Sequence, residues 1–600
     1  MNFKVIEQGS DYVFRTIRII RDKLLILDPN VGIVILNNKF ERIGVITHPF
    51  VTRELFVSEN GRLLALVSNS EMGTLYIGDE SYFVWEEKKT RENYYIDIIN
   101  FETKETILSL RSSLEPTFVE FSPDERRIII GFGTPHIILF DLTTGESRKI
   151  TFVDSILSGK WVDDSKLLLL HGNMEFLLYD LYTDKSDNVF RYEGGDLAAS
   201  FIDRKRKSLY YLPEGSNKII RLNYGTGEKK TVLKFRYVVN DFVYLPSMDI
   251  IIVLGDKYFL KVFDLNLNNW ITGRELLFLD EIFFTASEYL TYISSSDRTF
   301  TYSTIDFKPI SKFMVKKIKE IAANNNELAA LYSTGLIKIW DLSNWEIINT
   351  LKLEETASIS YIGEKLFIGN ENQVLIYEDG DLSNFITFDA EVMKLMNAGD
   401  LVLALLEDET LHGLKVSDKE PIKLGSNVKA VFYDPWGKRL AMASSITREV
   451  NDEIERLMDV KVIKVEGQDV VVHYPVKMEN MDRIFLVGKY ILACDGSDVK
   501  VFEIGSKLSE RKVKEHLDYL NTGVLIDKGR TFLASTLKKE LMIIDSESLK
   551  CLKCIRLPFY IREILYRPKR DLIIVKTSTS DVVSIKKSEL VAKIPKSEIS

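Results

Sequence analysis

Cysteine is nearly absent from this chain of 600 residues, which contains only three. So few thiols exclude a fold held by disulfides and leave little material for a structural zinc site. Cys551 and Cys554 form one C-x-x-C pair without a second pair nearby, within a segment (549–556) that reads as an outer strand. Residues three apart on a strand point to opposite faces, so we expect two ordinary strand cysteines.

Histidine is also sparse, with six residues along the chain. None of them has the spacing of metal ligands, and none belongs to a catalytic motif. We therefore expect no cofactor, no metal and no enzymatic activity, although a site assembled from distant residues would leave no motif. The six are His48, His136, His171, His412, His473 and His516.

Long apolar runs are missing as well. No stretch reaches the roughly 18 uninterrupted apolar residues of a membrane span, and the start (1–7) lacks a basic cap followed by an apolar run. Excess positive charge is also lacking, because the formal net charge is −9. We expect a cytoplasmic protein without membrane contact. A local basic patch would still permit contact with nucleic acid, which we do not favour.

Glutamine is used only three times, at Gln8, Gln373 and Gln468, whereas Lys, Glu and Ile are abundant. This bias resembles thermophile usage. It concerns habitat and does not bear on activity.

The residues that are present describe a globular chain. Hydrophobic residues make up 45% and charged residues 28%, and the 14 Pro and 32 Gly are spread along the sequence without a long linker. Two domains of roughly 300 residues are reasonable for a large repeat fold.

One short phrase recurs throughout: a β-rich run ends in an aromatic or aliphatic residue, then Asp or a substitute, then a polar turn. The intervals average about 42 residues, within the range of about 40 to 45 for a four-stranded propeller blade. Fourteen repeats predict an all-β fold of two consecutive β-propellers with seven four-stranded blades each. The equivalent positions are Ile35, Asn100, Asp141, Asp180, Arg221, Asp264, Thr304, Asp341, Glu378, Gly413, Lys464, Glu503, Asp545 and Ser584.

The repeat at 117–152 shows how one blade forms. Two β-branched and aromatic runs flank the turn Ser122-Pro123-Asp124, where proline presets φ and aspartate bonds its own backbone. A third strand ends near Leu142, and a fourth follows the turn after it. Such a sheet cannot bury both faces alone, so stacking identical neighbours in a ring creates the core.

These features resemble the WD-repeat propeller proteins: the Ser-Pro-Asp turn at 122–124, the Trp340-Asp341 dipeptide and the repeat period. The resemblance covers nearly the entire chain and implies the fold more than any function. The repeats are degenerate, because only one has a true Trp-Asp and few retain the family's histidine before the first strand. His516 resembles that histidine, with Ser535 as its expected hydroxyl partner.

We place the domain boundary from the eighth repeat position, Asp341, whose blade begins near Ile318. This predicts an N-terminal propeller over residues 1–312 and a C-terminal propeller over 313–600. Residues 3–7 read as an extra strand before the first blade, so they are candidates to complete a distant sheet and tie the two ends of the chain together.

The interval from Ile35 to Asn100 is 65 residues, much longer than the mean. Binding residues lie in loops more often than in the strands of a scaffold, so the extra residues of this interval are candidates for a functional site. We predict an added hairpin over 74–86, between the second and third strands, that presents aromatic residues; 75–77 could instead be a third strand. The candidate partner-binding residues here are Tyr76, Tyr82, Phe83, Trp85 and Arg91.

A second long interval runs from Gly413 to Lys464. Apolar residues at 450, 454, 457 and 458 recur at helical spacing, which predicts a short amphipathic helix over 447–458. Arg448, Ile454 and Arg456 are its candidate partner-binding residues. Both insertions could instead only pack against their own ring.

Basic residues gather in the turns between first and second strands. In the first propeller they are candidates for a phosphate-binding rim, with ordinary solvated turns as the alternative. The candidate basic rim is Arg126, Arg127, Arg204, Lys205, Arg206 and Lys207.

Taken together, the sequence predicts a non-catalytic scaffold that binds other proteins. Two alternatives remain: an accessory subunit of an RNA-processing or RNA-modifying complex, and a propeller enzyme with a site in a central channel. The partner, the pathway and the oligomeric state are not readable from these residues.

Overall fold

The computed structural model describes residues 4–591 with short gaps, and within them almost the whole chain is β-structure. The gaps are 8–15, 30, 38, 49–50, 70–71, 78–79, 86–93, 193–196, 256–258, 276–282, 287–289, 295–297, 304–308, 315–316, 418–419, 451–452, 466–469, 477, 479–480, 497, 506–507, 512–516, 518 and 558.

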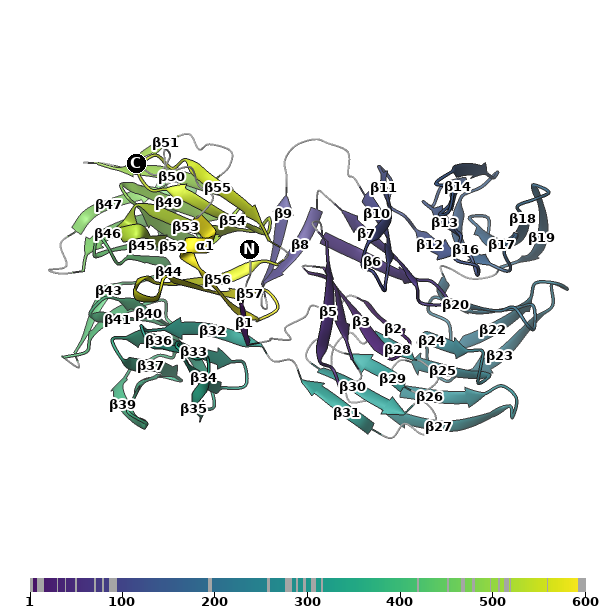
Figure 1. Cartoon of the computed structure of the whole chain (residues 1–600), viewed down its shortest axis with the longest axis horizontal. Helices are drawn as coiled ribbons and strands as arrows, with labels where there is room; N and C mark the ends of the chain where they lie inside the picture. The colour runs from purple at the N-terminus through teal and green to yellow at the C-terminus, as the bar shows by residue number, and fades with distance from the viewer. Residues whose placement is uncertain are drawn as a thin grey trace. The chain divides into compact units, whose positions relative to one another are not determined.

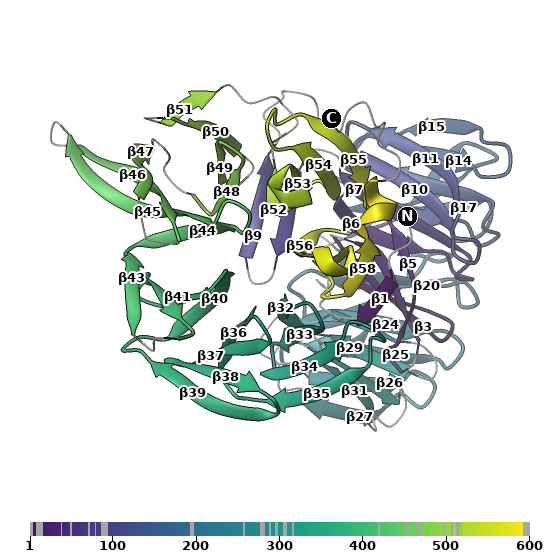
Figure 2. The same ribbon diagram turned by 60° about the vertical axis from the view of Figure 1, so that its left-hand side comes forward.

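The described strands form fourteen four-stranded antiparallel sheets and one two-stranded sheet (Figures 1 and 2). In most sheets the four strands follow one another along the chain, which is the meander of a propeller blade. The predicted all-β propeller fold is confirmed.

The chain divides into two compact units. The N-terminal unit comprises Val13–Gly73 and Glu86–Met314. The C-terminal unit comprises Val315–Ser600 together with Met1–Tyr12 and Thr74–Trp85. Each unit holds seven of the four-stranded sheets.

The sheets of the N-terminal unit, in chain order and separated by semicolons, have these strands: β2 (Thr16–Ile20), β3 (Lys23–Asp28), β4 (Gly32–Leu36), β5 (Arg42–Thr47); β6 (Val51–Val57), β7 (Leu63–Asn69), β10 (Tyr94–Asn100), β11 (Thr106–Ser112); β12 (Phe118–Phe121), β13 (Arg127–Gly131), β14 (His136–Asp141), β15 (Ser147–Thr151); β16 (Ile156–Trp161), β17 (Lys166–His171), β18 (Glu175–Asp180), β19 (Lys185–Arg191); β20 (Leu197–Asp203), β21 (Ser208–Pro213), β22 (Lys218–Asn223), β23 (Lys229–Lys234); β24 (Val239–Leu245), β25 (Ile250–Gly255), β26 (Phe259–Asp264), β27 (Asn269–Glu275); β28 (Phe283–Ala286), β29 (Leu290–Ser294), β30 (Arg298–Ser303), β31 (Pro309–Met314).

The sheets of the C-terminal unit have these strands: β32 (Ile318–Ala323), β33 (Glu327–Tyr332), β34 (Leu336–Asp341), β35 (Ile347–Lys352); β36 (Thr356–Ile362), β37 (Lys365–Asn370), β38 (Gln373–Glu378), β39 (Asp381–Thr387); β40 (Val392–Ala398), β41 (Leu401–Leu406), β42 (Leu411–Lys415), β43 (Pro421–Gly425); β44 (Val428–Asp434), β45 (Arg439–Val450), β46 (Glu453–Lys464), β47 (Val470–Val476); β48 (Arg483–Val487), β49 (Tyr490–Asp495), β50 (Asp498–Ile504), β51 (Leu508–Arg511); β52 (Leu520–Ile526), β53 (Thr531–Thr536), β54 (Glu540–Asp545), β55 (Cys551–Arg556); β56 (Ile561–Arg567), β57 (Leu572–Thr577), β58 (Val582–Lys586), β1 (Lys4–Glu7). A short helix, α1 (Lys587–Val591), follows β58.

The position of a strand within its sheet decides its burial. Second strands such as β7, β21 and β25 are buried along their whole length, because neighbouring sheets cover both of their faces. Fourth strands such as β11 and β15 are mostly exposed and polar. The core therefore lies between successive sheets, as a ring of stacked blades requires.

The turns are built from the polar residues that the repeat places there. At the turn between β12 and β13, the backbone N–H of Arg127 donates to Ser122 Oγ at 2.9 Å, and that of Arg126 donates to Asp124 Oδ1 at 3.0 Å. At the end of β14, Asp141 Oδ1 accepts the N–H groups of Thr143 and Thr144, which lowers the pKa of this carboxyl group. The recurring aspartates are therefore turn residues.

The start of the chain completes the last sheet. Strand β1 pairs antiparallel with β58, with Lys4 opposite Ser584 and Val5 opposite Val583 (Figure 2). The predicted extra strand near the N-terminus is thus found as the fourth strand of a sheet whose other three strands lie near the C-terminus.

Contacts between the first and last sheets close each unit. In the C-terminal unit, one core cluster joins Ile318 and Trp340 to Ile574 and Val582, with Ile6 of β1 packed against it. Glu7 adds polar ties, because its Oε1 accepts hydrogen bonds from Tyr332 Oη at 2.7 Å and Lys338 Nζ at 2.8 Å. In the N-terminal unit the closing contact is between β2 and β28.

The first long interval contains the predicted hairpin. Strands β8 (Met72–Ile77) and β9 (Glu80–Trp85) form the two-stranded sheet, inserted between the second and third strands of the sheet β6-β7-β10-β11. The third strand of that sheet is β10, so the alternative third strand at 75–77 is wrong.

The helix predicted for 447–458 is wrong. This segment is a hairpin in which β45 and β46 pair through twelve positions, ending with Val450 opposite Glu453 (Figure 2). Positions 454 and 458, which suggested a helical period, are also spaced for one face of a strand, and Met458 begins an alternation with Val460 and Val462 in which all three residues are buried. Adding to an existing ladder overrides the weak helical spacing.

Among the described residues, no helix has the length and apolar character needed to cross a membrane.

Candidate functional site

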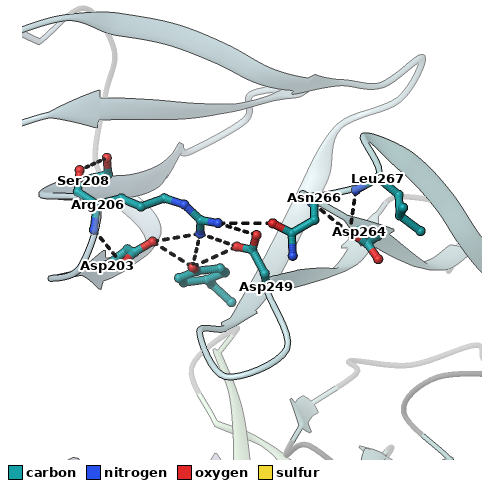
Figure 3. Close-up of polar contacts among 8 residues, drawn as sticks. Asp203, Arg206, Ser208, Asp249, Asp264, Asn266 and Leu267 are labelled. Carbon is teal, nitrogen blue, oxygen red and sulfur yellow. Dashed lines mark hydrogen bonds and ion pairs between the residues drawn. The ribbon is translucent and has the colours of Figure 1, made fainter.

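Arg206, a candidate of the basic rim, is engaged by the chain's own acids (Figure 3). Its guanidinium pairs with Asp249, and its Nη1 lies 3.1 Å from Asp203 Oδ2 and 3.2 Å from Tyr244 Oη. Hydrogen bonds to Asp249 raise the pKa of Arg206. The cluster joins the turn after β20 to the turn after β24, so it is a joint between neighbouring sheets.

Arg204 is used in a similar way. Its Nη1 donates to both carboxylate oxygens of Glu59, at 2.7 and 2.6 Å, and its Nη2 donates to the backbone oxygen of Trp161 at 3.3 Å. Glu59 lies between β6 and β7, in a sheet that is not a neighbour of the Arg204 sheet. This bond therefore reaches across the end of the ring.

Arg127 donates to the backbone oxygen of Asp164, lies 4.0 Å from an Asp124 carboxylate oxygen and sits over the Trp161 ring at 5.4 Å. Its neighbour Arg126 is exposed, as are Lys205 and Lys207. The six rim residues thus divide into three arginines held by intramolecular contacts and three side chains that face solvent.

The partner-binding candidates lie on the two hairpins. Tyr76 is in β8, and Tyr82, Phe83 and Trp85 are in β9. Arg448 is in β45, and Ile454 and Arg456 are in β46. Arg91 and all the side chains of these candidates lie outside the described residues.

Polar residues on first strands form a further group, which the sequence did not predict as functional. Several first strands carry a β-bulge near their start, which places a polar residue at the third position. In the C-terminal unit these residues include Glu320, Ser358 and Glu563. A polar residue two places after a buried strand start, as in Ile318 and Glu320, was the available signal.

These bulge residues link successive sheets around the ring of the C-terminal unit. Glu563 Oε2 accepts the N–H of Ile321 at 2.9 Å, and Glu320 Oε2 accepts the N–H of Ile359 at 2.8 Å. Ser358 Oγ in turn accepts the N–H of Leu395 at 2.9 Å. Each side chain satisfies a backbone donor of the next sheet, which binds adjacent sheets together.

Two lysines lie near the glutamates that make these hydrogen bonds between sheets. The Lys576 ammonium, only 3% exposed, pairs with Glu563 and also donates to the backbone oxygen of Lys319. Burial raises the pKa of Glu320, and the neighbouring Glu563 raises it further, while the Lys394 ammonium opposes both. Glu563 therefore has an ion-pair partner, whereas the Lys394 charge only partly offsets the burial of Glu320.

First-strand residues of the C-terminal unit line two cavities, and Glu320, Lys394 and Glu563 line both. The cavity at the starts of the first strands is about 530 Å³ and is also lined by Lys317, Lys319, Arg562 and Lys576. The cavity at the ends of the first strands is about 560 Å³ and is lined by residues from six sheets. We name the second one the channel-end cavity; both have the size of small-ligand sites.

The N-terminal unit has its own charged first-strand residues. Arg18 of β2 and Asp241 of β24 lie close enough to influence each other's ionisation. Burial raises the pKa of Asp241 to about 6, although the hydrogen bond from its neighbouring N–H and the Arg18 charge favour the ionised form. Burial also lowers the pKa of Arg18, against the attraction of Asp241 and Glu54.

A buried Ser-His-Asp group occurs in the N-terminal unit but lacks catalytic geometry. His48 Nε2 lies 2.5 Å from Asp97 Oδ2 and 3.5 Å from Ser68 Oγ. A catalytic triad needs its serine and aspartate on opposite ring nitrogens, whereas here both meet the same one. Burial alone would raise the pKa of Asp97, but hydrogen bonds from His48 and Ser109 hold it below its usual value.

His48 precedes the first strand β6, and Ser68 lies on the second strand β7, which is the arrangement expected for His516 and Ser535. Ser535 Oγ donates instead to the Ile561 backbone oxygen at 3.3 Å, and His516 lies outside the described residues. A contact between a histidine before a first strand and a hydroxyl on the second strand is thus seen in the sheet β6-β7-β10-β11, which the sequence did not single out.

Cys494, Cys551 and Cys554 are free thiols. Within the described ranges, no three His, Cys, Asp or Glu side chains gather in a group that could hold a metal ion.

Comparison with known proteins gives a partial likeness. No family model matches the chain. The chain is similar to the Tol-Pal system protein TolB of Wolinella succinogenes, with 36% identity over 81 residues, which cover 13% of this chain and 19% of TolB. The chain therefore matches about a fifth of that relative's length. TolB is a β-propeller protein, so the likeness agrees with the fold.

Proposed function

We propose that this protein is a non-catalytic, cytoplasmic scaffold that holds other proteins on the faces of two propeller rings. The observation that carries this proposal is the use of charged side chains as joints between sheets. Glu563, Glu320 and Arg206 all bind neighbouring sheets of their own unit. Such joints make rigid faces, and rigid faces lose little conformational entropy when a partner binds.

An RNA-binding accessory role receives less support. Arg127, Arg204 and Arg206 contact carboxylates or backbone oxygens of the chain, so their charge is partly neutralised before any phosphate arrives. The formal net charge of −9 also repels nucleic acid at long range.

The testing experiment is purification of the tagged chain from its native cells at moderate salt. Mass spectrometry and nucleic-acid quantification are applied to the same eluate. The proposal predicts at least one protein partner in stoichiometric amount. RNA that disappears on raising the salt would replace the scaffold with the accessory role. A chain recovered alone would contradict both.

A variant tests the aromatic hairpin as the partner surface. Replacing Tyr82, Phe83 and Trp85 of β9 with serine is expected to reduce partner recovery and leave thermal unfolding unchanged. The matched control is Ile347→Ser with Ile348→Ser, which removes two residues of β35 that are about half exposed (51% and 50%). If the control lowers recovery equally, the hairpin has no special role.

A further inference from the structure

The channel-end cavity of the C-terminal unit has a largely apolar and aromatic wall. Its volume of about 560 Å³ is sufficient for a small ligand or for one or two side chains of a protein. Trp436 is 39% exposed at this wall, and its indole N–H donates to the Leu525 backbone oxygen at 3.3 Å. The aromatic lining residues are Tyr361, Phe432, Tyr433, Trp436 and Tyr566.

Arg567, the last residue of β56, lines the same cavity. One Nη donates to the Ala323 backbone oxygen, and the other donates to the Tyr566 backbone oxygen at 3.3 Å. The Nε atom is buried and has no hydrogen-bond partner. Carbonyl oxygens thus take two of the five N–H donors of this side chain.

No carboxylate balances the charge of Arg567 among the described residues. Burial lowers its pKa to about 10, and no charged neighbour contributes to this shift. The two glutamates of the same wall are already engaged: Glu563 pairs with Lys576, and Glu320 Oε2 accepts hydrogen bonds from the Ser358 hydroxyl and the Ile359 N–H. A buried cation without a counter-ion is costly, so it marks a place where an anion gains affinity.

Linking neighbouring sheets explains the hydrogen bonds of Arg567 to backbone oxygens, but it does not explain why its charge has no counter-ion. Arg570 makes the comparable link to the first sheet, because its Nε donates to the Asn325 backbone oxygen at 2.7 Å. Arg570, however, lies near a carboxylate, since its charge helps to lower the pKa of Asp341. Arg570 is also not part of the cavity wall described for this site. A link between sheets therefore requires neither the cavity nor the unbalanced charge.

We propose that the channel-end cavity is a recognition site for a carboxylate carried next to apolar or aromatic groups, presented by a segment of a partner protein. Arg567 binds the carboxylate through its remaining Nη donors, and the aromatic wall covers the apolar groups. This inference rests on the proposed scaffold function and specifies the chemistry of one partner contact.

The first test uses 3-phenylpropanoate as the probe and the uncharged 3-phenylpropanamide as its match. Binding to the full chain is followed by saturation-transfer NMR and by tryptophan fluorescence, for which Trp436 is the local reporter. We expect a Kd on the order of 1 mM for the acid, because a probe this small makes few contacts with the cavity. The amide should bind roughly tenfold more weakly, because a charge-assisted hydrogen bond is lost.

Two variants locate the site. Arg567→Gln should weaken binding of the acid by roughly tenfold, whereas Arg570→Gln, which also removes a link to the first sheet, should leave it unchanged. If Arg567→Gln proves unstable in thermal unfolding, Arg567→Lys takes its place. This variant keeps the charge, so its affinity for the acid should fall between those of Arg567→Gln and Arg570→Gln. Equal binding of acid and amide, equal effects of the two Gln variants, or no binding of the acid at about 10 mM would overturn the proposal.

The second test repeats the purification from native cells with Arg567→Gln and Arg570→Gln. Loss of one protein partner with Arg567→Gln alone supports a site for a partner segment. Recovery of every partner with both variants overturns the assignment to a partner segment while the scaffold function stands. Absence of partners for the unaltered chain removes the scaffold itself, so the two failures are distinguishable.

Discussion

The two units contain the same number of four-stranded sheets but complete their last sheets differently. In the N-terminal unit, β28 to β31 follow one another along the chain, and this sheet meets the first one through the contact of β28 with β2. In the C-terminal unit, the last sheet takes its fourth strand, β1, from the opposite end of the chain. A borrowed strand makes the stability of the C-terminal unit depend on residues some 580 positions away in sequence.

In the C-terminal unit, backbone hydrogen bonds and side-chain contacts both help to close the ring. β1 supplies both, since it pairs with β58 and its Glu7 reaches Tyr332 and Lys338 of the first sheet. Such a long-range contact costs loop-closure entropy during folding, but this cost grows only slowly with the number of residues between the two strands.

The largest expected effect comes from deleting residues 1–7. This removes the β1 ladder and the packing of Ile6, so the C-terminal unit should lose on the order of 3 to 5 kcal/mol of unfolding free energy. Hydrogen exchange read by mass spectrometry reports both units at once. Protection should fall in β56 to β58 and β32 to β34 and stay unchanged in the N-terminal unit. Equal loss in both units would contradict the independence of the two closures.

Glu7→Ala should have the next largest effect. It leaves the Lys338 ammonium and the Tyr332 hydroxyl without their acceptor while keeping the backbone pairing of β1. We expect a loss of about 2 kcal/mol in the C-terminal unit, measured by urea unfolding. Glu102→Ala is the control, because it breaks an ion pair whose partners are 60% and 62% exposed and should cost about 0.5 kcal/mol or less.

The dependence of stability on pH tests the buried charge of Asp241 in the N-terminal unit, independently of the contacts that close that unit. The pKa of Asp241 is about 6 in the folded unit, above the unfolded value of about 3.9. The folded state therefore binds more protons between these values, so this group lowers stability as pH rises from about 4 to about 6. Asp241→Asn should remove that decrease and gain about 1 to 2 kcal/mol at pH 7.

The difference between the unaltered chain and Asp241→Asn is the quantity to measure, by thermal unfolding at several pH values. The other carboxyl groups titrate in both proteins and cancel. A difference that does not change between pH 4 and pH 7 would show that Asp241 has the same pKa in the folded and the unfolded chain. Arg18 is the charge that most favours this outcome.

Ser122→Ala should have the smallest effect. It removes the hydroxyl that accepts the N–H of Arg127 at 2.9 Å in the turn after β12. We expect a loss of about 1 kcal/mol confined to the N-terminal unit. Differential scanning calorimetry checks this, and an equal shift of both unfolding transitions would mean that the two units do not unfold separately.

Much of the fold was predictable because its signals are local. The aspartates at the ends of third strands, such as Asp141, bind backbone N–H groups two and three residues away. The alternation of strands and turns repeats this chemistry at a regular interval, so sheet count and strand order follow. The aromatic hairpin was also predictable, since an interruption of the repeat is visible in the sequence itself.

The errors arose where tertiary contacts override local pattern. Residues 447–458 have apolar spacing that fits a helix, yet the neighbouring strands extend through them as a hairpin. The rim arginines were identified as basic turn residues, but Asp249 and Glu59, which hold Arg206 and Arg204, come from other sheets. No local signal links residues that far apart.

The sequence by itself determined the all-β repeat, the turns that end its strands and the two interruptions, because each depends on residues close together along the chain. Only the tertiary structure decided which charges are neutralised and which remain. Glu320, Glu563 and Arg567 all lie on first strands and line the same cavity, but folding brings a lysine close to each of the first two and, among the described residues, no carboxylate that balances the third. Charge balance depends on neighbours that only folding brings together, and so it could not be read from the chain.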